Sequence, residues 1–126
     1  MDSIVHFEIP VNVPKEAKKF YNEVFGWNIS QWGQQEYWMA VTTEVDEQSQ
    51  RPKNPGAING GIFKREGVFK GPIVTIAVAD IETALSKIEV AGGKKVRGKE
   101  PVGEMGWTAY FEDNQGNLMG LWQSKA

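Results

Sequence analysis

The sequence predicts an α+β protein built from two copies of one βαβββ module. The first observation is a weak internal repeat, because a shift of 67 residues places His6 on Ile73 and aligns two strand–helix segments. The second observation is that a glycine followed by an apolar and an aromatic residue occurs late in each half, at 61–63 and 120–122. A strand, a helix and further strands are therefore expected twice.

Length and composition limit the class of protein. The 126 residues suffice for one domain with a packed core, so we expect a single domain over 1–126 with modules at about 1–66 and 71–126. The absence of cysteine excludes disulfides and thiolate chemistry. A net charge of −2 and dispersed basic residues argue against nucleic acid as a partner. No membrane segment and no signal pattern are found, so we expect a cytoplasmic protein.

The first strand and helix are predicted from periodicity. Residues 5–11 are mostly apolar, and strand alternation puts His6 and Glu8 on the face opposite Phe7 and Ile9. A helix over 14–26 then begins at a proline and ends at a glycine, as helices commonly do. Its apolar face consists of Ala17, Phe20, Tyr21, Val24 and Phe25.

The rest of the first half contains three predicted strands and a long loop. Residues 27–32 and 37–42 alternate as strands around a turn at 33–35. Residues 44–59 are polar and contain two prolines, and loops longer than about 12 residues are usually functional or mobile. Residues 58–64 form the last strand of this half.

The second half repeats this plan. A strand over 72–78 leads to Asp80, a favourable N-cap for a helix over 81–91 that Gly92 and Gly93 end. A turn rich in Asp, Asn and Gly is predicted at 113–117. The remaining predicted strands are 94–97, 107–112 and 118–123.

Several of these segments together resemble a known family. The chain resembles the vicinal oxygen chelate superfamily, which includes glyoxalase I, the bleomycin-resistance proteins and the extradiol dioxygenases. It is most similar to a glyoxalase-like subgroup whose chains end in a Gly-Asn-x-x-Gly-Leu-Trp pattern. The matching segments are His6 to Pro10, Phe20-Tyr21, Phe25-Gly26-Trp27, Val78 to Ile81, Ala84-Leu85, Gly92-Gly93, Asp113 and Gly116 to Trp122.

The resemblance implies a fold and a set of ligand positions. Paired βαβββ modules would cup a central cavity, and metalloenzyme relatives take ligands from the first and last strands of each module. The corresponding positions here are His6, Ile73, Gly61 and Gly120. Relatives usually have His or Gln at the position of Ile73, and Glu or Gln at the two glycine positions.

Only one of these four positions can bind a metal. A catalytic divalent ion typically needs three or more protein ligands, and isoleucine and glycine supply none. Glu8 shares the face of His6, but two neighbouring positions on one strand do not surround an ion. We therefore expect no metal site and no cofactor, with His6 hydrogen-bonded to a neighbour in a pocket or core; a divalent metal is the alternative.

Other catalytic arrangements find little support. With one histidine and no cysteine, a Cys–His pair is excluded, and no serine lies in a nucleophile-elbow sequence. Two-carboxylate chemistry by Glu8, Glu104 and Glu112 stays open, although Glu104 and Glu112 suit a solvent-exposed surface.

A small-molecule pocket is the remaining prediction. Gly61 and Gly120 are expected to leave space where relatives have a carboxylate or amide side chain. Either Trp38 with Ala40, or Tyr37 with Met39, should line the pocket, although aromatic residues also fill cores. The candidate ligand-binding residues are His6, Glu8, Tyr37, Trp38, Gly61, Trp107 and Gly120.

Three functions follow from these observations. The sequence favours a protein that binds a small-molecule ligand without a catalytic metal. The alternatives are a metal-dependent glyoxalase-related lyase, isomerase or dioxygenase using His6, and an interaction protein whose cavity is filled. A homodimer is expected, because each module presents an apolar sheet face and two-fold dimers are the commonest assemblies.

Overall fold

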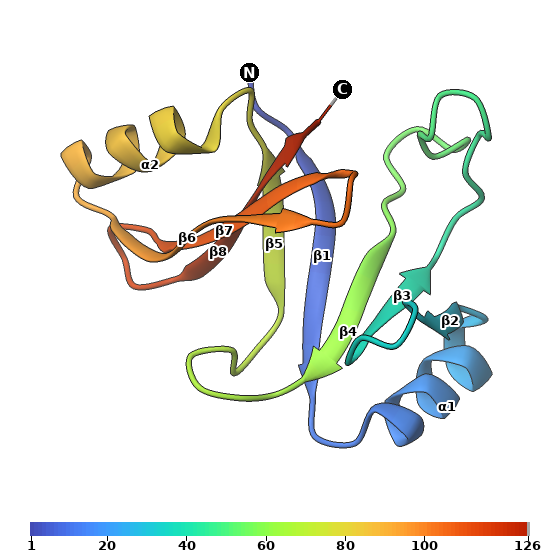
Figure 1. The fold of residues 1–126 in the computed structure, drawn as a ribbon. Coiled ribbons are helices and arrows are strands. Elements are labelled where there is room, and N and C mark those ends of the chain that lie inside the picture. Colours follow the sequence, from blue (N-terminus) through green and yellow to red (C-terminus); the bar gives the residue numbers. More distant parts are fainter. Residues whose placement is uncertain (126) are drawn as a thin grey trace. The chain divides into compact units, whose positions relative to one another are not determined.

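The computed structural model describes residues 1–125 of the chain, and it confirms the predicted α+β fold. Two βαβββ modules follow one another along the chain (Figure 1). The chain divides into two compact units, which we call the N-terminal unit, His6–Pro72, and the C-terminal unit, Met1–Val5 with Ile73–Ala126. Met1–Val5 joins the C-terminal unit, where the Ala77 N–H donates to the Ser3 carbonyl oxygen at 2.9 Å. No helix in residues 1–125 is long and apolar enough to cross a membrane.

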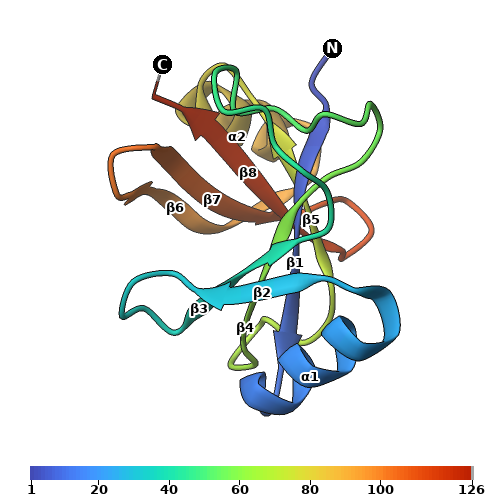
Figure 2. The same cartoon turned by 90° about the vertical axis from the view of Figure 1, so that its right-hand side faces the viewer.

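The N-terminal unit holds α1 and four strands in the order β2-β3-β4-β1 (Figure 2). Its elements are β1 (Ile4–Val11), which belongs to this unit from His6 onward, α1 (Pro14–Phe25), β2 (Asn28–Gln31), β3 (Tyr37–Val41) and β4 (Gly60–Lys64). β1 pairs in parallel with β4, while β3 pairs antiparallel with β2 and β4. These registers show which residues of β1, β4 and β3 lie beside one another in the sheet.

One face of this sheet forms the core of the N-terminal unit. Side chains that alternate along the strands point toward α1, as strand geometry requires. The fully packed members are Val11, Ile29, Ala40 and Ile62. Phe7, Ile9, Ala17, Tyr21, Trp27 and Trp38 pack against them.

Helix α1 has the predicted bounds but a more exposed apolar face than expected. Gly26 ends it with a φ of 74°, and the Gly26 N–H donates to the Asn22 carbonyl oxygen at 2.9 Å. Ala17 and Tyr21 pack on the core, whereas Phe20, Val24 and Phe25 are 54, 56 and 60% exposed. The period of 3.6 identifies which residues share a face, but the sheet covers only part of that face.

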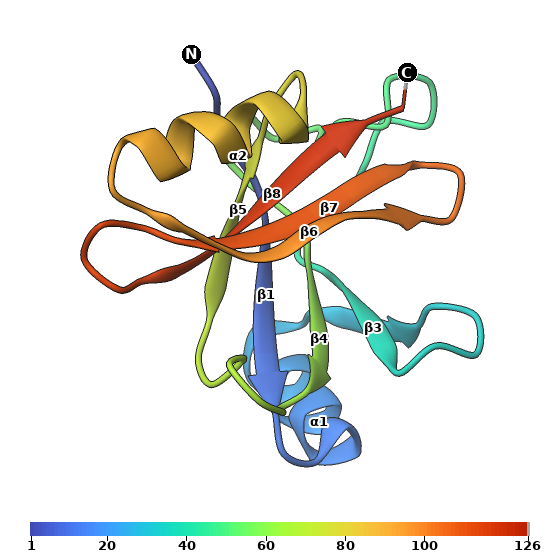
Figure 3. The same cartoon turned by 60° about the vertical axis from the view of Figure 1, so that its left-hand side comes forward.

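The C-terminal unit holds α2 and the strand order β5-β8-β7-β6, and α2 lies across these strands (Figure 3). Its elements are β5 (Ile73–Ala77), α2 (Ile81–Val90), β6 (Lys94–Val102), β7 (Gly106–Glu112) and β8 (Leu118–Ser124). Its core consists of Ile81, Leu85, Ala109, Phe111 and Leu121. The Asp80 carboxylate accepts from the Thr83 N–H at 2.8 Å and confirms the predicted N-cap.

Strand β6 is longer than the predicted 94–97. It continues to Val102 because two register shifts against β7, between Lys95 and Arg97 and between Arg97 and Glu100, absorb the irregular residues. Such bulges keep a strand paired while it bends. Strand β2 is shorter than predicted and covers Asn28–Gln31 only.

The chain between β3 and β4 forms the predicted long loop. One side chain links the two ends of this loop. The Asn59 amide oxygen accepts hydrogen bonds from the N–H groups of Thr42 at 2.8 Å and Thr43 at 3.0 Å. The Thr42 hydroxyl also donates to the Ile58 carbonyl oxygen at 2.5 Å. The two ends of the loop are therefore held together just before Gly60 and Gly61.

Candidate functional site

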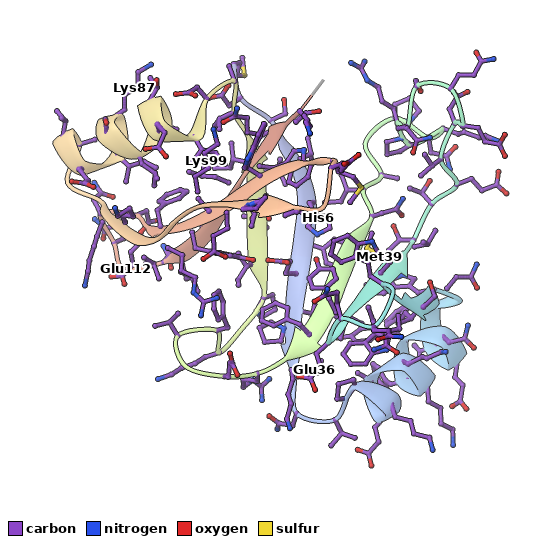
Figure 4. All side chains as sticks on the ribbon, viewed as in Figure 1. His6, Glu36, Met39, Lys87, Lys99 and Glu112 are labelled. Carbon is purple, nitrogen blue, oxygen red and sulfur yellow. The ribbon has the colours of Figure 1, made fainter. Side chains whose placement is uncertain are left out.

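The candidate site lies on the face of the N-terminal sheet opposite α1. Phe7 and Ile9 pack on the core, so alternation along β1 places His6 and Glu8 on the other face. The strand registers put Gly61 beside Glu8 on one side and beside Met39 on the other. Figure 4 labels His6 on β1 and Met39 on β3. Three adjacent strands thus contribute to this face.

His6 is hydrogen-bonded to Tyr37. The His6 Nε2 and the Tyr37 Oη are 2.8 Å apart, across the width of β4. Burial lowers the pKa of His6 from 6.5 to about 4, because the protein interior disfavours the charged imidazolium. The imidazole is therefore neutral at pH 7, and the expectation of a hydrogen-bonded histidine is confirmed.

The space beside Gly61 is occupied, which corrects the expectation that this glycine leaves it open. A Cβ built at Gly61 would collide with the hydroxyl and ring of Tyr37. The Tyr37 ring lies parallel to the Phe63 ring, with centroids 6.2 Å apart and an interplanar angle of 8°. Tyr37 thus fills the position of the missing β4 side chain, because it reaches diagonally across the sheet.

Glu8 is a buried acidic residue on the same face. It is 6% exposed, and its backbone is in register with Gly61. A buried carboxyl group needs compensating interactions, and Glu8 has a partner within the protein. The face therefore combines an imidazole, a phenol and a carboxyl group.

Trp38 lies on the opposite side of this sheet. It packs against the core that contains Ile29, Ala40 and Ile62, while Tyr37 is hydrogen-bonded to His6. Of the two alternatives for β3, the structure places the set with Tyr37 and Met39 on the face of His6. Trp38 belongs to the core of the N-terminal unit.

The other candidate residues belong to the C-terminal unit. Trp107 packs on its core, and the Lys99 Nζ lies 4.4 Å from the centroid of the Trp107 ring. Gly120 is in register with Thr75, and a Cβ built at Gly120 would lie 2.7 Å from the Thr75 Oγ1. The space beside this glycine is therefore also taken, which again corrects the expectation. Ile73 is 1% exposed in the same unit.

Comparison with known proteins identifies the family. Residues 3–121 match the family model described as "Glyoxalase/Bleomycin resistance protein/Dioxygenase superfamily". The chain belongs to this superfamily. The predicted resemblance is thereby confirmed over nearly the whole sequence.

Two curated relatives share 31% identity with the chain over 114 residues. Both are named "Putative glyoxylase CFP32", one from Mycobacterium bovis and one from Mycobacterium tuberculosis. The match covers 86% of this chain but only 40% of each relative. The chain therefore corresponds to less than half of these glyoxylase-named proteins.

Solved structures of other proteins share the fold. A hypothetical protein from Bacillus halodurans has a TM-score of 0.66 at 14% identity, with 99% of this chain and 96% of that chain covered. A Streptomyces coelicolor methylmalonyl-CoA epimerase variant has a TM-score of 0.64 at 17% identity, with 98% and 97% covered. At these identities the likeness establishes the fold.

The metal-ligand positions of glyoxalase relatives do not form a donor set here. Residues 1–125 contain no group of three or more His, Cys, Asp or Glu side chains placed to hold a metal ion. His6 is one donor, and its Nε2 is within hydrogen-bond distance of Tyr37. Ile73, Gly61 and Gly120 offer no donor atom. The residues present therefore do not fit the metal of the metalloenzymes.

Sequence reasoning missed two residues that shape the two glycine sites. Phe63 supports the Tyr37 ring, and Thr75 fills the space beside Gly120. Alternation along each strand already placed Met39 with Tyr37. The contacts of Phe63 and Thr75 depend on strand register, which only long-range pairing determines.

Proposed function

We propose that this protein binds a small molecule and acts without a catalytic metal. The observation that supports this most is the hydrogen bond between His6 Nε2 and Tyr37 Oη. His6 is the one side chain able to bind a metal among the four expected ligand positions, and this hydrogen bond pairs it with a phenol. Tyr37 also occupies the space beside Gly61, where metalloenzyme relatives carry a ligand side chain. The proposed binding face comprises His6, Glu8, Tyr37 and Gly61.

Metal analysis tests the absence of a catalytic ion. The protein, purified after supplementation with Zn, Ni, Mn or Fe, should hold much less than one ion per chain. One tightly held ion per chain, lost on His6→Ala, would overturn the proposal and favour the metal-dependent lyase, isomerase or dioxygenase.

Thermal stability tests small-molecule binding. A ligand that binds only the folded state raises the melting temperature by mass action. We expect a metabolite collection to contain compounds that stabilise the wild-type protein and stabilise His6→Ala less. Compounds that stabilise both proteins equally would place binding away from His6 and count against this face.

A homodimer is the second part of the proposal. Phe20, Val24 and Phe25 on α1 are each more than half exposed, and large apolar groups of this kind favour association. A second copy supplies the same surface by two-fold symmetry. Sedimentation should show twice the mass of one chain at micromolar concentration, and a single-chain mass would contradict this.

A further inference from the structure

Residues 59 and 60 form the one Asn-Gly pair in the sequence. Every other asparagine is followed by a residue that carries a side chain. Glycine leaves its own amide nitrogen unhindered and gives the main chain more freedom to turn. The Gly60 nitrogen is therefore the backbone nitrogen of this chain that can most readily attack the side-chain amide of a preceding asparagine.

The fold uses both members of this pair. A Cβ built at Gly60 would lie 2.5 Å from the Phe7 carbonyl oxygen and 2.6 Å from the Phe7 ring, so a larger residue does not fit. Asn59 supplies the amide oxygen that accepts the N–H groups of Thr42 and Thr43. The chain thus carries a reactive pair at a place where packing demands the glycine and hydrogen bonding uses the asparagine.

The folded arrangement keeps the two reacting groups from meeting. We call the place where Asn59 joins Thr42 and Thr43 the loop base; it lies at the root of the long loop between β3 and β4 (Figure 1). Gly60 begins β4 and is paired with β1 on one side and β3 on the other. Attack on the amide requires the side chain to leave its two N–H donors and the main chain to rotate, so the loop base must open first.

We propose that Asn59 is a site of spontaneous deamidation that the closed loop base protects, so that modified chains are those in which the loop base has opened. The Gly60 nitrogen forms a bond to the Asn59 Cγ, and the amide nitrogen leaves as ammonia together with the proton of the Gly60 N–H. Water then opens the five-membered imide. Cleavage of its Cγ–N bond leaves aspartate, and cleavage of its other C–N bond leaves isoaspartate.

The two products should affect the fold differently. Aspartate keeps an oxygen where the N–H groups of Thr42 and Thr43 need an acceptor. Isoaspartate instead routes the main chain through the former side chain and lengthens it by one carbon. This displaces Gly60 from its close fit against Phe7. The isoaspartate form should therefore be the less stable product.

Peptide mass spectrometry of aged protein tests the site. The protein is incubated at neutral pH, folded or in urea, and the mass gain from amide to acid is followed at each asparagine. Asn59 should react first, and at least about tenfold faster in urea, because the bonds of the loop base are then absent. Asn28, which is exposed and precedes Ile29, is the internal control and should stay unmodified. An unmodified Asn59 in urea, or equal rates in both states, would overturn the proposal.

A matched pair of variants tests whether opening of the loop base controls the reaction. Thr42→Val removes the hydroxyl that donates to the Ile58 carbonyl oxygen, and folded Thr42→Val should deamidate about fivefold faster, the effect of one neutral hydrogen bond. Thr108→Val removes a hydroxyl that donates to the Leu121 carbonyl oxygen in the C-terminal unit, and it should react at the wild-type rate. Equal rates for the two variants would overturn protection by the loop base.

Melting temperatures test the consequence for the fold. Asn59→Asp, which carries the aspartate product from the start, should melt like the wild type. The isoaspartate fraction of aged wild-type protein, separated by its added charge, should melt at a lower temperature. Coincident melting of this fraction and Asn59→Asp would refute the difference between the products. These measurements use no ligand, so their outcome is independent of the proposed binding function.

Discussion

The two units carry a glycine at the same point of their last strand and fill the space beside it differently. In the N-terminal unit the Tyr37 side chain extends from β3 over Gly61, and its hydroxyl is hydrogen-bonded to His6 on β1. In the C-terminal unit a hydroxyl on the paired strand β5, that of Thr75, takes the space beside Gly120. The comparison teaches that a missing side chain in a sheet does not by itself create a cavity, because a neighbouring strand supplies a replacement.

The units also differ at the start of their first strands. His6 is a titratable group whose pKa is lowered by burial, whereas the matched Ile73 is apolar and 1% exposed. A polar network therefore exists in one unit, and the same position is plain core in the other. Each of the following experiments changes one side of this comparison.

The largest expected effect is the loss of stability that His6, in the N-terminal unit, produces as the pH falls from 6.5 to 4. His6 binds its proton near pH 6.5 when unfolded and near 4 when folded, so the unfolded state holds more protons between these values. The free energy of unfolding should therefore decrease as the pH is lowered from 6.5 to 4, by up to about 3 kcal/mol. Urea unfolding at a series of pH values measures this.

His6→Gln serves as the control for this acid response. It removes the titrating group, so its stability should change less between pH 6.5 and 4 than that of the wild type. Hydrogen bonds also lower the pKa of Asp46, Asp80 and Asp113 from 3.8, but their contributions are lost only at lower pH. Identical slopes for wild type and His6→Gln would refute the burial of a neutral His6.

The next effect compares one added methyl group in each unit. Gly61→Ala should cost about 3 kcal/mol, because the new Cβ displaces the Tyr37 ring and breaks its bond to His6. Gly120→Ala should cost about 1 kcal/mol, because only the Thr75 side chain has to adjust. Chemical denaturation measures both, and an equal cost would mean that Tyr37 is not specially fitted to Gly61.

A smaller effect distinguishes the two helix N-termini. Asp80 caps α2 by accepting hydrogen bonds from the Thr83 N–H and hydroxyl, so Asp80→Ala should lower the melting temperature. α1 begins after Val13, whose side chain makes no cap, so Val13→Asp should add about 0.5–1 kcal/mol. Thermal unfolding of the two variants should shift in opposite directions, and shifts of the same sign would contradict this account.

The smallest effect on folding is expected on the exposed side of α1. Val24 is 56% exposed, so Val24→Gln should change the free energy of unfolding of a single chain by less than about 0.5 kcal/mol. If α1 forms the dimer contact, the same variant should dissociate more readily in sedimentation. An unaltered dimer would place the contact elsewhere.

Local signals carried the prediction of the fold. Helix starts and ends and one turn are marked by single residues or short segments, namely Pro14, Gly26, Asp80 and residues 113–117. The internal repeat showed that the same order of elements occurs twice. The length of β6 could not be read in this way, since its register shifts depend on pairing with β7. Periodicity likewise grouped the apolar residues of α1 without showing how little of that face the sheet covers.

The candidate site was predictable only in part. Alternation joined His6 with Glu8, and Tyr37 with Met39, because side chains on one strand follow a fixed period. The choice between Tyr37 and Trp38 required the register between strands. The filling of the space beside Gly61 depended on one long side chain crossing a strand diagonally, which no local pattern encodes.

The Asn59 amide oxygen accepts hydrogen bonds from the N–H groups of Thr42 and Thr43, which has a practical consequence for rearranging the chain. Because the two strands meeting at this loop are joined at their base, the polypeptide between Asp46 and Arg51 can be opened without separating them. New termini placed there, with the original ends connected by a flexible linker, should yield a circular permutant that keeps the imidazole–phenol contact intact. The same segment is a suitable point for inserting a fluorescent reporter.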